Sequence, residues 1–314
     1  MVKRDQIEHA AEAIREGKIV AFPTETVYCL GADVYNRAAV EKIFDAKKRP
    51  KYDPLIIHIS DRDQLPPLVD YIPPKAEALI ERFWPGGLTL VLQRRHTYHD
   101  IITAGMEGVS VRLPSNETAR ALIRLAKTPI AVAAANSFGN VSPTTAQHVR
   151  DDLGDAVEII LDDGPCTIGI ETTIISFLED KPLKLRPGAV VLEEIEKVIG
   201  PVRRSLPPGY ASFFPGMSDH HYTRRNVMMF MDEVKQFPKE LEIGLLSFRP
   251  IDDTSPFSAV EVLSPDGDLR EAARNLFSAL RRLDTADMDL IVAQRVPEVG
   301  LGIVINDRLA RACF

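Results

Sequence analysis

The chain has 314 residues and is acidic, because 45 aspartates and glutamates outnumber 38 lysines and arginines and give a net charge of -7. This length allows two domains, and 45% hydrophobic with 26% charged residues is ordinary for a soluble globular protein. The charge argues against a surface that coats nucleic acid, and no apolar run approaches the roughly 20 residues that span a bilayer.

The first two hundred residues alternate helical and strand patterns. Ile7, Ala10, Ala11 and Ile14 recur at helical spacing, and Gly17 is placed to end that helix. Val40, Ile43 and Phe44 mark a second helix, and further helices are predicted at 75–83, 116–127 and 144–153. Buried strands are predicted at 18–23, 55–60, 88–93, 109–113, 129–135, 157–161 and 173–177. This order predicts an α/β fold with a mixed sheet.

The pattern breaks after Gly200, where residues 201–217 are rich in Pro and Gly and lack periodicity. We therefore predict a domain at 1–200, a linker at 201–239 and a small second α/β domain at 240–314. In the second domain, strands are predicted at 242–248, 259–263 and 289–294, with a helix along the apolar positions from Leu269 to Leu280.

The cysteines and the amino-terminal residues indicate the compartment. Cys29, Cys166 and Cys313 are widely spaced and form no C-x-x-C pair, which argues against a disulfide framework and a structural zinc. The first residues contain no apolar stretch typical of a secretory signal. We expect a cytoplasmic protein without membrane contact.

Lys47, Lys48, Arg49 and Lys51 form a cationic cluster between helix and strand. In an acidic chain such a cluster indicates a local anion site, although a solvated turn at a helix carboxyl end would hold the same cations. No P-loop and no G-x-G-x-x-G motif is present, so a nucleotide would not be bound by a common glycine loop. The pairs Asp151–Asp152 and Asp162–Asp163 are interpreted as a helix face and a turn, and no protein-only metal site is predicted.

Polar islands also follow several predicted strands, where α/β folds bind their ligands. Arg112 sits in a short apolar run and needs an anionic partner, because a lone buried guanidinium is very costly. His58 lies within an apolar strand and, taken alone, is interpreted as a core histidine with its hydrogen bonds satisfied.

In order and spacing, these islands closely resemble the long, two-domain form of the threonylcarbamoyl-AMP synthase family. The resemblance covers about residues 5–223 well, and rests on Pro-Thr-Glu-Thr-Val-Tyr (23–28), Lys-x-Arg (47–49), Ser-Val-Arg-Leu-Pro (110–114), Ser-Pro-Thr (142–144), Glu-Thr-Thr (171–173), Arg-Pro-Gly (186–188) and Pro-Gly-Met…His-His-Tyr (215–222). It implies a YrdC-type catalytic domain with a twisted mixed sheet and helices, and a smaller Rossmann-like C-terminal domain.

The resemblance implies a nucleotidyltransferase that condenses L-threonine, bicarbonate and ATP into threonylcarbamoyl-AMP and pyrophosphate. A separate tRNA threonylcarbamoyl transferase machinery then modifies tRNA, and weak tRNA binding by this chain stays open. Mg²⁺ would arrive with ATP. The positions that match the family's threonine contacts are Thr26, His58, Arg112 and Thr172, with Arg112 on the amino-acid carboxylate. The positions that match its ATP contacts are Lys47, Arg49, Asp53, Asn136, Ser142, Arg186 and Tyr222, of which Lys47 and Arg49 would be catalytic and Tyr222 belongs to a lid formed by the linker.

The chain departs from the family pattern at several of these motifs. Ala134 replaces the first serine of Ser-x-Asn, Asp53 stands where Asn is usual, Cys29 replaces a glycine, and Thr172 replaces serine. In the lid, Ser218 and Asp219 replace the usual Lys and Tyr.

Two other functions are compatible with such a domain. A non-catalytic YrdC-type RNA-binding paralogue would bind tRNA in a salt-dependent way without releasing pyrophosphate. A carbamoyl transferase working from carbamoyl phosphate would carry acylphosphatase and zinc-finger regions before the domain, whereas here the domain begins within about ten residues of the first Met.

Overall fold

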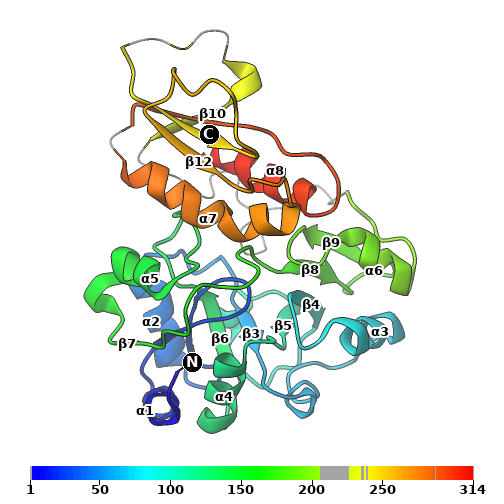
Figure 1. The fold of residues 1–314 in the computed structure, drawn as a ribbon. Coiled ribbons are helices and arrows are strands. Elements are labelled where there is room, and N and C mark those ends of the chain that lie inside the picture. Colours follow the sequence, from blue (N-terminus) through cyan, green and yellow to red (C-terminus); the bar gives the residue numbers. More distant parts are fainter. Residues whose placement is uncertain (1, 206–225, 235–236, 238–239, 287, 314) are drawn as a thin grey trace. The chain divides into compact units, whose positions relative to one another are not determined.

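The computed structural model describes residues 2–205, 226–234, 237, 240–286 and 288–313, and these belong to two compact units (Figure 1). The first unit comprises residues 2–138, 143–167 and 171–205, and the second comprises 139–142, 168–170 and the described residues from 226 onward. Tyr222, together with Ser218 and Asp219 of the predicted lid, lies outside the described residues.

The first unit is built on a mixed sheet that has nine strands in the described part of the chain, which confirms the predicted α/β class. The strands lie in the order β7-β1-β2-β6-β3-β5-β4-β8-β9 (Figure 1). The neighbours β1–β7, β3–β5 and β4–β8 are parallel, and the other pairs are antiparallel. Their bounds are β1 (Val20–Phe22), β2 (Cys29–Asp33), β3 (Ile56–His58), β4 (Leu88–Gln93), β5 (Gly108–Arg112), β6 (Ile130–Ala134), β7 (Ile159–Ile160), β8 (Thr173–Ser176) and β9 (Leu183–Arg186).

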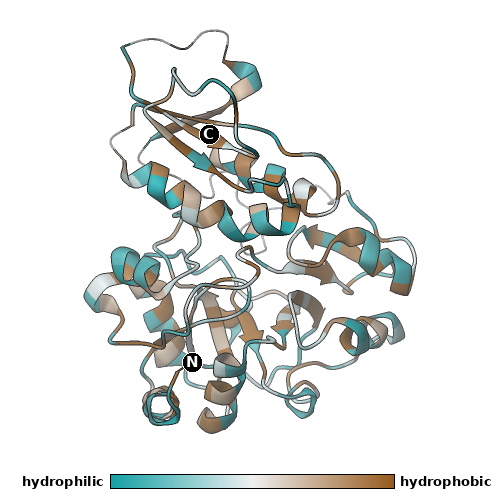
Figure 2. Cartoon of the chain, viewed as in Figure 1, coloured by the Kyte–Doolittle hydropathy of each residue, from teal (hydrophilic) through white to brown (hydrophobic). Residues whose placement is uncertain are grey.

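Helices cover this sheet and supply the rest of its core. They are α1 (Arg4–Arg15), α2 (Arg37–Lys47), α3 (Pro74–Phe83), α4 (Glu117–Ala126), α5 (Ala146–Leu153) and α6 (Leu192–Ile199), joined by short 3-10 turns at η1 (Arg62–Gln64), η2 (Asp100–Ile102) and η3 (Gly154–Ala156). The helices carry apolar and polar residues on different faces, whereas the central strands are mostly apolar and are buried along nearly their whole length (Figure 2). Strands buried on both sides show no alternation, because neither face meets water.

Helix α2 ends in a way that shapes the cationic loop. Asn36 caps its start by accepting a hydrogen bond from the Ala39 N–H, and Lys48 ends it in the left-handed conformation at φ 52°. The N–H groups of Lys48 and Arg49 then donate to the carbonyls of Asp45 and Phe44. This cap satisfies the last carbonyls of the helix and turns the chain sharply after Lys47.

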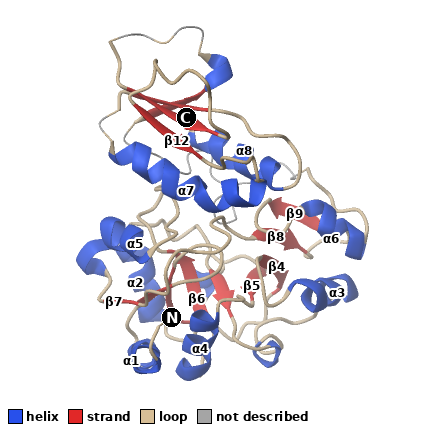
Figure 3. Ribbon diagram, viewed as in Figure 1, coloured by secondary structure: helices blue, strands red, loops and turns tan. Residues whose placement is uncertain are grey.

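In its described residues, the second unit contains an all-parallel four-stranded sheet in the order β10-β13-β11-β12. Figure 3 shows strands of this sheet in red, with β12 labelled. Its elements are β10 (Val227–Phe230), η5 (Met231–Glu233), β11 (Ile243–Ser247), β12 (Ala259–Val262), α7 (Leu269–Thr285), β13 (Leu290–Ala293) and α8 (Leu301–Ala312). Strand β10 lies inside the stretch assigned to the linker from sequence and pairs with β13, Val227 opposite Leu290. The parallel sheet with helices agrees with the Rossmann-like domain that the resemblance implied.

Among the described residues, no disulfide bond involves Cys29, Cys166 or Cys313. Within the described ranges, no helix combines the length and the apolar character needed to cross a membrane.

Candidate functional site

His58 and Arg112 are neighbours at one edge of the first sheet. They end the adjacent parallel strands β3 and β5, and the register pairs one residue with the other. The carboxyl ends of parallel strands meet at the same edge, where α/β proteins bind ligands. Both side chains are buried, with 1% of His58 and 2% of Arg112 exposed. The fold therefore places two predicted site residues side by side.

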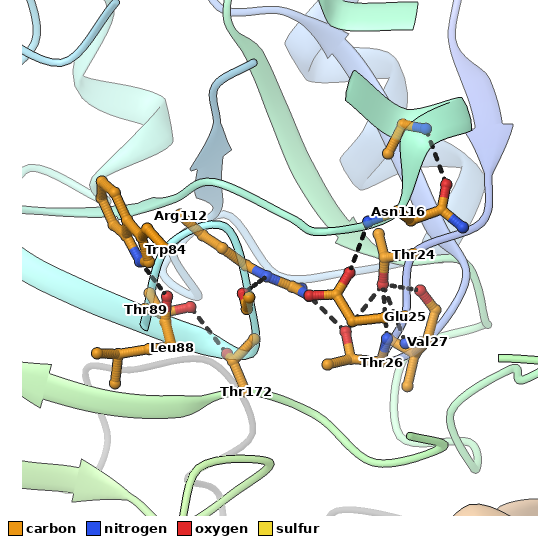
Figure 4. A network of polar contacts seen from close by, with 12 residues as sticks. Thr24, Glu25, Thr26, Val27, Trp84, Leu88, Thr89, Arg112, Asn116 and Thr172 are labelled. Atoms are coloured by element: carbon orange, nitrogen blue, oxygen red, sulfur yellow. Dashed lines mark hydrogen bonds and ion pairs between the residues drawn. The ribbon is translucent and has the colours of Figure 1, made fainter. Parts of the chain in front are cut away.

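Arg112 is held by partners from two loops (Figure 4). Its Nη2 donates to Glu25 Oε1 at 2.6 Å, its Nη1 to Thr26 Oγ1 at 2.9 Å, and its Nε to the Gly86 carbonyl at 3.0 Å. The anionic partner that its burial requires is thus Glu25, a residue that sequence analysis did not assign to the site. The signal was present, since Glu25 lies within the same polar island as Thr26.

Glu25 is a carboxylate in an apolar setting. Burial raises its pKa, but the charge and hydrogen bond of Arg112 and hydrogen bonds from backbone N–H groups outweigh burial, and the net pKa lies below the ordinary value. Its second oxygen accepts from the Asn116 N–H at 3.3 Å. Because a guanidinium has five N–H donors and three are used, one N–H on each terminal nitrogen of Arg112 is left for a ligand.

A hydroxyl-based turn orients Thr26. The Thr24 hydroxyl donates to the Val27 carbonyl at 2.6 Å and accepts from the N–H groups of Thr26 and Val27, while its oxygen lies 2.8 Å from Thr26 Oγ1 (Figure 4). Ser/Thr hydroxyls commonly close turns this way. The turn fixes the Thr26 hydroxyl against Arg112.

Thr172 is oriented by Thr89 of β4 and Arg186 of β9. Its hydroxyl accepts from Thr89 Oγ1 at 2.8 Å (Figure 4). It also accepts from Arg186 Nη2 at 3.2 Å. Arg186 also donates to the Thr172 carbonyl. At Gly188, an added Cβ would overlap the Glu171 carbonyl and the Thr172 backbone, so only glycine fits between the two motifs.

His58 is a neutral imidazole at this edge. Burial, and then the charge of Arg112, lower its pKa well below the usual value. Its ring stands edge-on to Phe22, with centroids 6.4 Å apart. Nδ1 has no hydrogen-bond partner among the described residues. A buried polar atom without a partner is costly, so this nitrogen differs from the satisfied core histidine expected from the strand alone.

Lys47 is buried at the end of α2. Its Nζ contacts the Ala134 carbonyl at 2.5 Å, the Asn136 carbonyl, and Asn136 Oδ1 at 3.4 Å. Burial, followed by the nearby charge of Arg49, lowers the pKa of Lys47 to about 7. Ala134, where the family pattern has serine, thus contributes its carbonyl instead of a hydroxyl.

Arg49 and Asp53 form a buried ion pair in the cationic loop. Their side chains meet at 2.8 Å with 7% and 11% exposed. Burial raises the pKa of Asp53 and lowers that of Arg49, although the ion pair opposes both shifts. Lys47 and Arg186 also act electrostatically on Asp53. This carboxylate therefore interacts with three cations, of which Arg49 is its direct ion-pair partner.

Asn136 and Ser142, the remaining predicted residues that the structure describes, are buried as well. The Asn136 amide donates to the Ser137 carbonyl at 3.0 Å. Ser142 is buried in the segment 139–142, which groups with the second unit. The other substituted position, Cys29, begins β2 opposite Phe22 and Ala134 and does not adopt positive φ, so a side chain fits there without strain.

A family described as "Telomere recombination", of Sua5, YciO and YrdC proteins, matches residues 12–188, and one described as "Threonylcarbamoyl-AMP synthase, C-terminal domain" matches residues 190–313. A Pyrococcus abyssi threonylcarbamoyl-AMP synthase is 42% identical over 98% of this chain and 94% of its own, and one from Bacillus subtilis is 39% identical over 98% and 92%. A crystal structure of P. abyssi Sua5 complexed with L-threonine matches with a TM-score of 0.90 and 41% identity, over 100% of this chain and 95% of that one. At 22% identity and a TM-score of 0.54, Escherichia coli YciO shares the fold over 59% of this chain.

Proposed function

Since the chain belongs to the threonylcarbamoyl-AMP synthase family, we propose that it is an enzyme that makes threonylcarbamoyl-AMP and pyrophosphate from L-threonine, bicarbonate and ATP. In reaction class it is a nucleotidyltransferase. Its product would pass to a tRNA threonylcarbamoyl transferase in the cytoplasm. The observation that carries the proposal is the full-length match to a relative whose crystal structure holds L-threonine, together with a buried arginine that has donors to spare.

L-Threonine would bind where β3 and β5 end. Two N–H groups of Arg112 suit a carboxylate, which takes a bidentate pair from one guanidinium. Glu25 and Thr26 hold that guanidinium in place before substrate arrives. The neutral His58 ring adds an uncommitted nitrogen beside it, and the hydroxyls of Thr26 and Thr172 add polar contacts. This set recognises a small amino acid with a polar side chain.

ATP would bind at the cations around Asp53. Lys47, Arg49 and Arg186 act on this carboxylate, and together they would spread charge off the phosphates. Asn136 fixes Lys47 through two oxygens. Ser142 and Tyr222 are assigned here by the family pattern. Mg²⁺ would accompany the triphosphate, because it prefers phosphate oxygens and water to a protein cage.

The chemistry needs positioning more than a protein nucleophile. The threonine amine and bicarbonate give a carbamate with loss of water. A carbamate oxygen then forms a bond to the α-phosphorus, and the bond to the bridging oxygen breaks to release pyrophosphate. Holding the reactants together can supply about 7–11 kcal/mol of the barrier reduction. Cations fixed in a buried site add electrostatic stabilisation as charge moves to the leaving pyrophosphate.

The direct test is pyrophosphate release from ATP by the full chain with bicarbonate, with and without L-threonine, and with L-serine as the control amino acid. We expect release that depends on both L-threonine and bicarbonate. Release that ignores L-threonine, or salt-dependent tRNA binding without any release, would contradict the proposal and favour the non-catalytic paralogue.

A further inference from the structure

The second unit contains a hollow of about 460 Å³ that the proposed reaction does not use. Its lining residues follow three adjacent strands directly. Met231 and Asp232 follow β10, Phe248 and Arg249 follow β11, and Gln294 begins the segment after β13. The carboxyl ends of neighbouring parallel strands are where open α/β sheets bind ligands. The hollow thus lies where this architecture favours a site, and its volume is within the range of small-molecule pockets.

Arg249 supplies a cation without an internal anion. Among the described residues it has no ion pair and no hydrogen bond, and its guanidinium lies over the Phe248 ring at 5.6 Å. Gly267 makes room for it: this residue has φ 75°, and a Cβ there would collide with the guanidinium. Arginine binds phosphate through paired N–H donors. An exposed guanidinium that lies over an aromatic ring is therefore suited to a phosphate group.

Arg295 and Gln294 add fixed polar groups. Arg295 is paired with Asp232 and Glu233, each at 3.1 Å, and stacks over Phe230 at 3.5 Å. The Gln294 side-chain oxygen accepts from the Phe248 N–H at 3.1 Å, which leaves its NH2 group as a donor. Because Arg295 is already neutralised by carboxylates, Arg249 is the cation on this wall that still lacks an anion.

The rest of the lining is apolar. Met231, Phe248, Pro250 and Ile251 contribute carbon surface to the same hollow. An inorganic anion would contact only Arg249 and would leave the apolar lining exposed to water. A ligand with a planar body and one phosphate would cover the wall and pair with Arg249 at once, and bases stack well on such side chains.

We propose that this hollow binds a nucleoside monophosphate, with its phosphate on Arg249 and its base against Met231, Phe248 and Ile251. The site is separate from the predicted ATP residues of the first unit, and the proposal does not depend on the function assigned to that unit.

The test uses the full chain labelled with ¹³C at the methionine methyl groups, and AMP as the probe. The chain has seven methionines, and Met231→Leu assigns the Met231 signal. We expect this signal to shift in a saturable way on addition of AMP, and Arg249→Ala to weaken the AMP affinity measured from it by about tenfold or more. Arg270→Ala is the matched control, since it removes an equally exposed cation from the first turn of α7, outside the lining.

Unlabelled adenosine and inorganic phosphate provide the discriminating arms. Weaker competition by each of them than by AMP supports the proposal. An unmoved Met231 signal at millimolar AMP, equal affinities in the Arg249→Ala and Arg270→Ala variants, or inorganic phosphate competing as well as AMP would each overturn it. Arg249→Lys keeps the positive charge but loses the paired N–H donors of the guanidinium. The methyl signals of the other methionines check that this variant is folded.

Discussion

Replacing Glu25 by glutamine tests whether Arg112 depends on an internal anion. The two side chains are 6% and 2% exposed, so solvent screens their interaction little. Leaving one partner of a buried pair uncompensated costs 3–5 kcal/mol. Glutamine keeps an oxygen that can accept the hydrogen bond from Nη2, so we expect the low end, about 3 kcal/mol of unfolding free energy. At pH 7 the whole loss should be present, because the pKa of Glu25 lies below its ordinary value of 4.5.

The assay is urea unfolding followed by tryptophan fluorescence. Trp84 is the single tryptophan of the chain, is 8% exposed and belongs to the first unit, so its signal follows that unit alone. With an m-value of about 3 kcal/mol per M, at the upper end for urea, the unfolding midpoint should fall by about 1 M. As the pH falls below about 4.5, wild type should lose this advantage, since protonation of Glu25 removes the same charge.

Glu8→Gln is the control for this experiment. It breaks an exposed pair with Arg4 in the same unit, whose side chains are 85% and 50% exposed. Such pairs contribute at most about 1 kcal/mol. If the two variants unfolded at the same urea concentration, the idea that Glu25 compensates a buried charge would be wrong.

Three further predictions concern the proposed reaction. Arg112→Ala should abolish pyrophosphate release that depends on L-threonine, and Arg112→Lys should restore little of it because an ammonium lacks the bidentate fork; normal turnover in either variant would contradict the threonine site. Since the pKa of Lys47 is about 7 without nucleotide and a triphosphate would raise it, ATP binding should take up a proton and its measured affinity should fall as pH rises above about 7; Lys47→Met should flatten that dependence. Gly188→Ala should force the Glu171–Thr172 backbone to move, with a loss of about 1–3 kcal/mol in unfolding free energy and of activity; an unchanged urea midpoint would show that the loop yields without cost.

Local pattern was sufficient for most elements of the fold. Strand β4 was predicted at 88–93 and spans Leu88–Gln93, because this short segment is mostly apolar and contains the β-branched residues Thr89 and Val91. Helix α4 was predicted within two residues, since its apolar face and the Asn116 cap agree.

The missed elements depend on contacts that are distant in sequence. Strand β2 contains Gly31, which lowers strand propensity, and the strand forms because a residue without Cβ lets Ile130 and Phe22 pack against it. Strand β9 pairs with β8 and, through Leu183, forms a bridge with Arg203, and it has no apolar run of its own. Helices α6 and α8 follow loops and were not singled out by their spacing.

For the candidate site as well, the sequence predicted the residues but not the contacts between segments that are distant in the chain. The motifs identified which residues are polar at strand ends, and the register of β3 and β5 does bring His58 beside Arg112. What pattern could not supply was the partner of each charge. Burial of Arg112 required an anion, but only the path of the 23–28 loop shows that Glu25 is that anion. Likewise, only the structure shows that the negative charge of Asp53 is compensated by an ion pair with Arg49.

Lys48, the left-handed residue at the end of α2, is the position of the Lys-x-Arg motif that is most open to engineering and to natural variation. A lysine in this conformation lowers the folding stability by about 1 kcal/mol relative to glycine, because glycine has no Cβ to crowd the following carbonyl. The Lys48 side chain is exposed. Substitution at position 48 is therefore expected to stabilise the fold without changing Lys47 or Arg49. Natural variants with glycine or asparagine at this position should be tolerated.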